Sequence, residues 1–209
     1  MSDGTKTVVT FVTGNDNKLK EVQRMLEASC SVQSNNGSST CLSLPLQIQI
    51  ISQSIDLPEL QGTPEEVAVE KCTVAAAQVN GPVIIEDTSL CFKALGGLPG
   101  VYIRHFYDKI GNDGLCKLLS AFDDKSAYAQ CIFAFTRGPG EPIILFTGTT
   151  HGKIVSPRGE DGFAWDNIFE FTQNNESLTF AEMTPDVKNE VSHRKKALTG
   201  LCSFLRLFK

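Results

Sequence analysis

Hydrophobic residues in the first part of the chain switch between two spacings. Residues 8–12 are almost all apolar, which predicts a buried strand. Leu19, Val22 and Leu26 then recur at helical spacing, so we expect a helix directly after that strand. Within 44–55, leucine and isoleucine alternate with glutamine, which predicts a second strand. The chain therefore opens as strand, helix, strand.

The next element has a clear helix start. Thr63 suits the N-cap, Pro64 suits the first turn, and Glu66 completes a capping box. The helix is expected to run to about Val79, where Asn80-Gly81-Pro82 stops it.

Shorter elements follow this helix. The apolar run 83–85 predicts a short buried strand that ends on Glu86 and Asp87. The glycine- and proline-rich stretch 96–100 predicts a rigid turn, and leucine, isoleucine and phenylalanine spacing predicts two helices within 103–119.

From residue 127 the spacing changes again. We expect hairpin-connected strands at 127–135 and 143–155, joined through Gly138-Pro139-Gly140, and a C-terminal helix around 198–205. Strands that alternate with helices and then form a meander predict an α/β or α+β fold with a mixed sheet. The stretch 31–40 is rich in Ser, Asn and Gly, which predicts a flexible inserted loop.

Composition narrows the class of protein. The 209 residues suit one large domain or two small lobes, and no apolar run approaches the length of a membrane span. The first residues lack the features of a signal peptide, and seven cysteines without a C-x-x-C pair indicate a reducing compartment, so we expect a cytoplasmic protein. The net charge of −5 gives no general attraction to nucleic acid, so a bound polyanion needs a local cluster of cations.

A candidate anion site lies between the first strand and the first helix, at Thr13-Gly14-Asn15-Asp16-Asn17-Lys18. The first N–H groups of a helix favour an anion, Gly14 allows close approach to the backbone, and Lys18 supplies a point charge for a phosphate. The G-x-x-x-x-G-K-[ST] phosphate loop is absent, and in isolation a surface turn with a solvated lysine explains the segment better.

Three carboxylates are candidates for a metal site. Glu59 lies in a loop, and Glu86 and Asp87 follow the apolar run 83–85. Mg²⁺ takes hard oxygen ligands, usually one or two carboxylates together with water and substrate phosphates. Loop solvation and turn formation explain the same residues equally well.

Two later clusters offer groups that recognise a nucleoside. Phe163 or Trp165 can stack on a base while Asp166 accepts hydrogen bonds from its edge, although aromatic residues after a loop usually belong to the core. His193 and Arg194 open the C-terminal helix, where a cation is locally unfavourable unless a ligand is present. The alternative for this last cluster is a solvated basic patch.

Together these segments resemble the inosine triphosphate pyrophosphatase family, the Ham1-like nucleoside triphosphate pyrophosphatases, and its eukaryotic members in particular. The resemblance rests on motifs that occur in the family's order: Phe11–Asn15, Lys18–Val22, Ile55–Glu59, Gln61-Gly62, Glu86–Thr88, Ala94–Gly100, Asp124–Ala129, Trp165-Asp166, Phe180–Met183 and Val191–Arg194.

The resemblance implies hydrolysis of the non-standard purine triphosphates ITP, dITP and XTP to the monophosphate and pyrophosphate, which removes them from the nucleotide pool. It implies Mg²⁺ as cofactor, with Mn²⁺ as a substitute, and a homodimer. The acidic balance and the lack of a long apolar run predict that neither nucleic acid nor membrane is a partner. The implied fold is one domain over residues 1–209, α/β, with a long twisted mixed sheet and helices forming two lobes around a central nucleotide-binding cleft.

The resemblance also implies roles for particular residues. Glu59 and Asp87 hold the metal, and Asp87 and Lys18 are catalytic. The implied substrate-binding set is Thr13, Gly14, Asn15, Asp16, Asn17, Lys18, Lys71, Asp87, Thr88, Arg104, Phe163, Ala164, Trp165, Asp166, Lys188, His193 and Arg194.

The chain departs from the family pattern at three of its positions. Ala164 replaces a glycine and Asn167 a proline in the base-pocket segment, and Arg104 stands where eukaryotic relatives carry a ligand-binding lysine. Two alternatives stay open: a related pyrophosphatase that prefers another triphosphate, and a nucleotide-binding protein without turnover. A nucleic-acid-binding module is disfavoured by the acidic balance.

Overall fold

The computed structural model describes residues 7–30, 48–160 and 162–207. The loop expected at 31–40 lies outside these residues, as do the side chains of Asp16 and Leu26. None of the described helices combines the length and the apolar character that crossing a bilayer requires.

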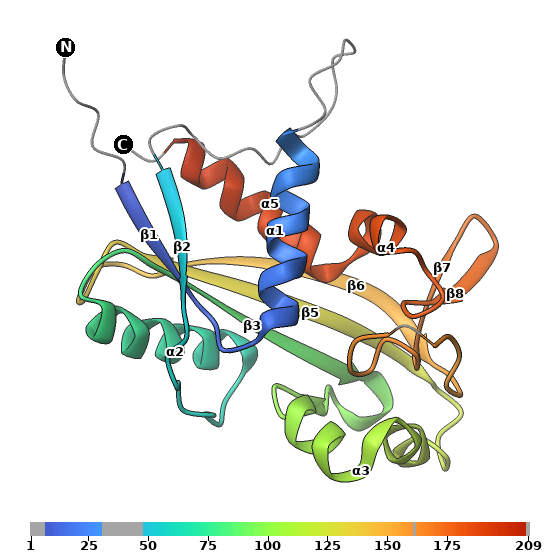
Figure 1. Cartoon of the computed structure of the whole chain (residues 1–209). Helices are drawn as coiled ribbons and strands as arrows, with labels where there is room; N and C mark the ends of the chain where they lie inside the picture. The colour runs from blue at the N-terminus through green and yellow to red at the C-terminus, as the bar shows by residue number, and fades with distance from the viewer. Residues whose placement is uncertain (1–6, 31–47, 161, 208–209) are drawn as a thin grey trace, which may run out of the picture. The chain divides into compact units, whose positions relative to one another are not determined.

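The described chain forms a mixed sheet with helices (Figure 1). The strands are β1 (Thr7–Val12), β2 (Ile48–Gln53), β3 (Val83–Phe92), β4 (Pro99–Gly100), β5 (Ser126–Thr136), β6 (Ile144–Ile154), β7 (Phe169–Gln173) and β8 (Glu176–Thr179). The helices are α1 (Asp16–Cys30), α2 (Pro64–Val79), the short 3₁₀ helix η1 (Lys93–Leu95), α3 (Ile103–Leu118), α4 (Pro185–Val191) and α5 (His193–Arg206). The sheet order is β2-β1-β3-β5-β6-β7-β8, and β4 pairs with β3.

The chain divides into two compact units. Unit 1 comprises Met1–Asp87, Ile132–Thr147 and Lys195–Lys209, and unit 2 comprises Thr88–Cys131 and Gly148–Arg194. The chain passes from one unit to the other within β3, β5 and β6. Each unit has its own hydrophobic cluster.

In unit 1, strand pairing decides what lies beside the end of β1. β1 runs parallel to β2 and to β3, and its last residue, Val12, pairs with Gln53 on one side and Ile85 on the other. The residues after Val12 therefore leave the sheet next to Glu86 and Asp87. This register brings together two segments that lie more than seventy residues apart in the sequence.

Helix α2 packs through small residues. Ala68, Cys72, Ala75 and Ala76 are fully buried against Val83, Ile85 and Val12. The spacing of these four positions places them on one face of the helix, and their small side chains allow close packing against the sheet. The predicted capping box is confirmed, and Asn80 ends the helix in the left-handed conformation.

Two expectations for the strands are wrong. The strand that begins at Val83 does not end at Asp87 but continues to Phe92, so the acidic pair lies in the middle of β3. Burial of Leu90, Cys91 and Phe92 favours continuation of the strand, and lysine partners compensate the acidic pair. Val8 is exposed although it belongs to the apolar run that was expected to be buried.

Unit 2 contains elements that hydrophobic spacing alone did not reveal. The predicted pair of helices within 103–119 is confirmed as α3, which is broken at Gly111 (φ 62°, ψ −173°). The β7–β8 hairpin and α4 were not predicted. The hairpin turns at Asn174 and Asn175, both at positive φ, and asparagine is one of the residues that tolerates this conformation.

The N-cap of α2 gives a first testable prediction. The Thr63 hydroxyl accepts a hydrogen bond from Glu66 N–H (3.3 Å), and Glu66 Oε2 accepts one from Thr63 N–H (2.9 Å). Thr63→Ala should destabilise the protein by about 1 kcal/mol, measured as a lower midpoint of urea unfolding. Thr73→Ala, at an exposed position inside the same helix, is the control and should cause no comparable loss. Equal effects of the two substitutions would contradict the capping role.

Candidate active site

The turn after β1 is organised by its own side chains. Asn15 Oδ1 accepts hydrogen bonds from the backbone N–H groups of Asn17 (3.0 Å) and Lys18 (3.1 Å), so Asn15 is the N-cap of α1. The Thr13 hydroxyl accepts one from Asn15 N–H (3.2 Å). The backbone N–H groups at the start of α1, which were expected to face an anion, therefore donate to Asn15 Oδ1 in this structure. Gly14 lies exposed between these residues.

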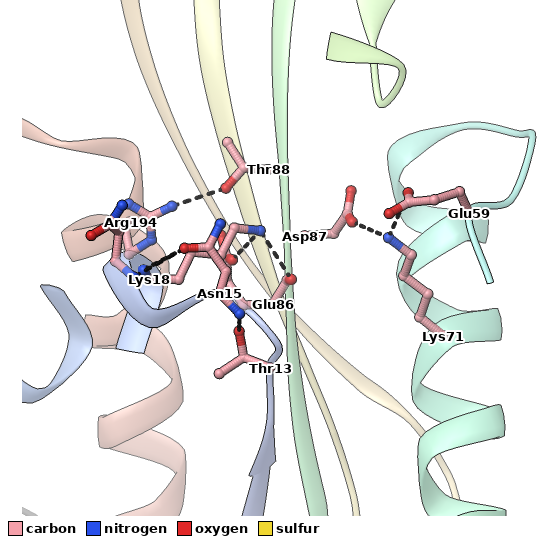
Figure 2. A network of polar contacts seen from close by, with 10 residues as sticks. Thr13, Asn15, Lys18, Glu59, Lys71, Glu86, Asp87, Thr88 and Arg194 are labelled. Atoms are coloured by element: carbon pink, nitrogen blue, oxygen red, sulfur yellow. Dashed lines mark hydrogen bonds and ion pairs between the residues drawn. The ribbon is translucent and has the colours of Figure 1, made fainter. Parts of the chain in front are cut away.

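Glu86 and Asp87 point to opposite faces of β3 because they are successive residues of one strand. Lys18 of α1 reaches Glu86, with 2.6 Å between Nζ and Oε2, and the Glu86 side chain is completely buried. In Figure 2 the two lysines approach β3 from opposite sides, Lys18 with α1 and Lys71 with α2. Each buried carboxylate is thus neutralised by a helix on its own face.

Lys71 joins two carboxylates. Its Nζ lies 2.7 Å from Asp87 Oδ1 and 3.4 Å from Glu59 Oε2. Burial alone lowers the pKa of the Lys71 ammonium, but Asp87 and Glu59 together raise the pKa above its ordinary value. Asp87 is buried and Glu59 is exposed, so the three groups connect the core of unit 1 to its surface.

Glu59 and Asp87 offer the kind of oxygen ligands that Mg²⁺ binds. Oxygens of Glu59 and Asp87 converge on one positive charge, which is the Lys71 ammonium in this structure. Mg²⁺ commonly binds one or two carboxylates and completes its shell with water and phosphate oxygens. Among the described residues no group of three or more His, Cys, Asp or Glu side chains forms a cage for a metal. A site of two carboxylates therefore suits a metal that arrives with a phosphate ligand.

In unit 2, a buried ion pair holds the Phe163–Asp166 turn. Lys188 Nζ lies 2.7 Å from Asp166 Oδ2, and the same oxygen accepts a hydrogen bond from Phe163 N–H (2.9 Å). The backbone closes the turn through Asp166 N–H to Phe163 O (3.1 Å). Ala164, at the first central position, has φ 53°, a conformation that costs an alanine about 1 kcal/mol or more.

Aromatic packing places Trp165 in the core. The residue is only 7% exposed, and its ring packs against Phe169, Phe180 and His193. His193 stacks parallel to Phe180, with 6.2 Å between ring centroids. Trp165 therefore agrees with the simpler interpretation of a core aromatic residue, whereas Phe163 is only half-buried.

The basic cluster of unit 2 is not a solvated patch. Lys188, His193 and Arg194 are all buried. Arg194 Nη2 donates to the Thr88 hydroxyl (3.1 Å), on the residue that follows Asp87 along β3. Arg104 lies exposed in the first turn of α3. Buried cations require specific partners, so the burial favours a built site over a charged surface.

One charged cluster escaped the sequence reasoning. Arg158 pairs with Glu170 (2.6 Å) and with Glu182 (3.2 Å), and Glu182 also accepts a hydrogen bond from Thr179 N–H (2.7 Å). The cluster joins residue 158 to the end of β8, because Thr179 also donates its hydroxyl to Arg158 O. The sequence signal for this charged cluster was limited to Glu182, which lies in the family motif Phe180–Met183.

Known proteins are similar to this chain over nearly its whole length. Residues 9–204 match the Ham1 family. The chain belongs to that family. A relative from Pyricularia oryzae named inosine triphosphate pyrophosphatase is 50% identical over 196 residues, which cover 94% of this chain and 92% of the relative. Relatives of the same name from Fusarium vanettenii and Neurospora crassa are 48% and 49% identical, over 96% and 90% of their lengths and 95% and 93% of this chain.

Solved structures of Ham1 proteins have the same fold. A HAM1 protein from Coxiella burnetii aligns with a TM-score of 0.78 at 28% identity, over 95% of this chain and 98% of that one. The Staphylococcus aureus Ham1 protein aligns with a TM-score of 0.75 at 26% identity, over 97% of this chain and 100% of that one. The expected family and mixed-sheet α/β fold are confirmed for this Ham1 protein, while the roles of its individual site residues stay predictions.

The Arg158 cluster predicts how the stability of this Ham1 protein depends on pH. Burial raises the pKa of Glu170, but Lys153 and Arg158 outweigh burial and hold the pKa below its ordinary value of 4.5. A lowered pKa in the folded state stabilises the protein above pH 4.5, and this contribution is lost as the pH falls through the folded pKa.

Glu170→Gln should therefore lower the melting temperature at pH 7 and flatten its decline on acidification below pH 4.5. Glu176→Gln, at an exposed position in β8, is the matched control and should follow the wild-type curve. The prediction is contradicted if the Glu170→Gln and wild-type curves run parallel at acid pH.

Proposed function

We propose that this protein hydrolyses the non-canonical purine nucleotides ITP, dITP and XTP to the nucleoside monophosphate and pyrophosphate. The observation that carries the proposal is the convergence of two lysines and three carboxylates on the middle of β3. Support comes from relatives about half identical in sequence that are named inosine triphosphate pyrophosphatase. A Mycobacterium abscessus relative described as a nucleoside-triphosphatase and dITP/XTP pyrophosphatase aligns with a TM-score of 0.67 at 26% identity, over 95% of this chain and 100% of its own.

The lysines of unit 1 are suited to a triphosphate. Lys18 and Lys71 each pair with a carboxylate in this structure, and each lysine side chain stays partly exposed. A lysine is a point charge that rotates between partners, so it can transfer from a carboxylate to a phosphate oxygen. In the proposal Lys18, with the Thr13–Asn17 turn, and Lys71 bind the triphosphate and neutralise the departing pyrophosphate.

Glu59 and Asp87 would hold Mg²⁺, with Mn²⁺ as a substitute. When bound, the metal supplies positive charge that offsets the charge on the phosphate oxygens. Lys71 contacts both carboxylates in this structure and would bind phosphate oxygens next to the metal.

The proposed reaction is attack of water on the α-phosphorus. A bond forms between the water oxygen and Pα, and the bond from Pα to the bridging oxygen of the β-phosphate breaks. Asp87 orients the water and receives its proton, and pyrophosphate leaves with the electron pair of the broken bond. Such a displacement depends mainly on positioning and charge neutralisation, which agrees with a site built from lysines and carboxylates.

Selectivity is proposed to come from unit 2. Inosine and xanthine carry a keto oxygen at position six, whereas adenine carries an amino group there. Donors from Arg194, His193 and the backbone would pair with the keto oxygen and stay unpaired against adenine, which can separate rates by several powers of ten. Phe163 is the half-buried ring available for stacking, and Asp166 and Lys188 fix the turn that carries it. Guanine carries the same keto oxygen, so discrimination against GTP requires rejection of the amino group at position two.

The proposal also covers location and assembly. The family resemblance supports a homodimer, one functional domain over residues 1–209 and a small-molecule substrate. The scattered cysteines support a cytoplasmic location, and the acidic balance argues against nucleic acid.

A parallel substrate assay tests the proposal. Purified protein is incubated with Mg²⁺ and ITP, dITP, XTP, GTP or ATP, and monophosphate and pyrophosphate are quantified. We expect rapid release from the first three and little from GTP and ATP. Preference for a different modified triphosphate would favour the alternative pyrophosphatase. Binding of ITP without products would mean a nucleotide-binding protein that lacks turnover.

Asp87 offers a direct prediction about catalysis. Asp87→Asn removes a proton acceptor and a metal ligand with little change in shape, so kcat for ITP should fall by about 10²–10⁴-fold or more. Glu70→Gln, at an exposed position beside Lys71 on α2, is the matched control and should keep wild-type turnover. A folded Asp87→Asn protein with near-normal kcat would remove Asp87 from the mechanism.

A further inference from the structure

A polar contact outside the groups considered so far holds the Phe163–Asp166 turn. Asn112 Nδ2 donates to the backbone oxygen of Ala164 (3.0 Å) and to Asn167 Oδ1 (2.6 Å). One side-chain amide therefore bonds both to the first central residue of the turn and to the residue just after it. All of these residues belong to unit 2.

The orientation of the Asn112 amide follows from its surroundings. Its nitrogen faces two oxygens, and a flipped amide would instead place its oxygen against both. Asn112 Oδ1 is buried and finds no hydrogen-bond partner among the described residues. Leaving Asn112 Oδ1 buried without a hydrogen bond costs free energy, and the two hydrogen bonds that Nδ2 donates must offset this cost.

Asn112 lies on a well-anchored segment. It follows Gly111, where the chain breaks α3 and redirects its second half. In that half Leu115 is fully buried, and Cys116 Sγ donates to Val155 O (3.2 Å). The amide is therefore presented from a fixed element and not from a loose loop.

The turn that Asn112 contacts needs support. Ala164 adopts φ 53°, which alanine rarely does, and the strain persists only where the surroundings hold it. Lys188 fixes the turn through Asp166, and Asn112 fixes it through the carbonyl of the strained residue itself. Without Asn112, Ala164 would relax toward negative φ and rotate the peptide that links it to Trp165.

We propose that Asn112 is a positioning residue for base recognition: its amide holds Ala164 in the left-handed conformation that presents Phe163 to the purine. This inference rests on the proposed function, because it assigns the turn to base binding. The roles of Ala164 and Asn112 are therefore interdependent. Because glycine adopts positive φ without strain, replacing Ala164 by glycine should remove the need for the Asn112 contact.

Trp165 provides a readout that needs no turnover. It is the only tryptophan of the chain, it lies inside the turn, and it is 7% exposed. In Asn112→Ala its fluorescence should shift to the red, and quenching by acrylamide should rise at least about twofold as the turn opens. Asp113→Ala, at the exposed neighbouring position of the same helix, should leave emission and quenching at wild-type values.

Steady-state kinetics test the functional half of the proposal. Asn112→Ala should raise KM for ITP by about tenfold, with kcat within about threefold of wild type, because the lost contact positions the base and not the phosphates. Asn112→Asp, which has the same shape but lacks the Nδ2 donor, should behave similarly. Ala164→Gly in the Asn112→Ala background should restore both KM and the shielding of Trp165.

Each outcome bears on the proposal. Unchanged quenching and KM in Asn112→Ala overturn it, and so does a tryptophan change without a KM change or a failure of Ala164→Gly to rescue. If Asn112→Ala does not fold, Asn167→Ala serves in its place, because it removes only the 2.6 Å contact. It should change Trp165 quenching and KM in the same direction by a smaller amount. The proposal is overturned if neither changes. Wild-type protein that fails to hydrolyse ITP would refute the proposed function, while the Trp165 quenching comparison would still test whether Asn112 holds the turn.

Discussion

Burial of two adjacent carboxylates in the middle of β3 is the constraint on which unit 1 depends. Glu86 and Asp87 point to opposite faces of a covered strand, and an unpaired buried charge there would be strongly destabilising. Each is neutralised by a lysine, Lys18 from α1 and Lys71 from α2 (Figure 2). The start of α1 and the first half of α2 are therefore tied to defined points of the strand. In the proposed function, the same pairs supply the cations and carboxylates that would bind a metal–triphosphate complex.

The pairing also explains how a protein that is net acidic can bind a polyanion. Lys18 and Lys71 are held in place by carboxylates in this structure. In the proposed function Mg²⁺ would bind Glu59 and Asp87, the phosphates would bind the lysines, and one set of ion pairs would be exchanged for another. Unit 2 uses the same device on a smaller scale, where Asp166 is buried with Lys188 and fixes a turn. In the proposed function, the same buried charges would serve both stability and recognition.

Local signals were predictable from the sequence, and features set by long-range packing were not. The capping box at Thr63 and the asparagine stop at Asn80 act within a few residues, and both are confirmed. The length of β3 depends on lysines from α1 and α2 that make acidic residues tolerable inside a strand, which no local pattern contains. Family motifs pointed to the carboxylates and lysines of the site. Asn112 was missed because its partners Ala164 and Asn167 lie 52 and 55 residues away and meet it only through folding. Arg158 was missed because its partners Glu170 and Glu182 lie 12 and 24 residues away and form no local pattern with it.

The central claim is that water attacks the α-phosphorus of an inosine nucleotide at the carboxylate and lysine cluster of β3. Hydrolysis of ITP in water enriched in oxygen-18 tests it most directly, with the label located by mass spectrometry of the products. The account predicts one labelled oxygen in the monophosphate and none in the pyrophosphate. Label in the pyrophosphate, or release of single phosphates in place of pyrophosphate, would contradict it.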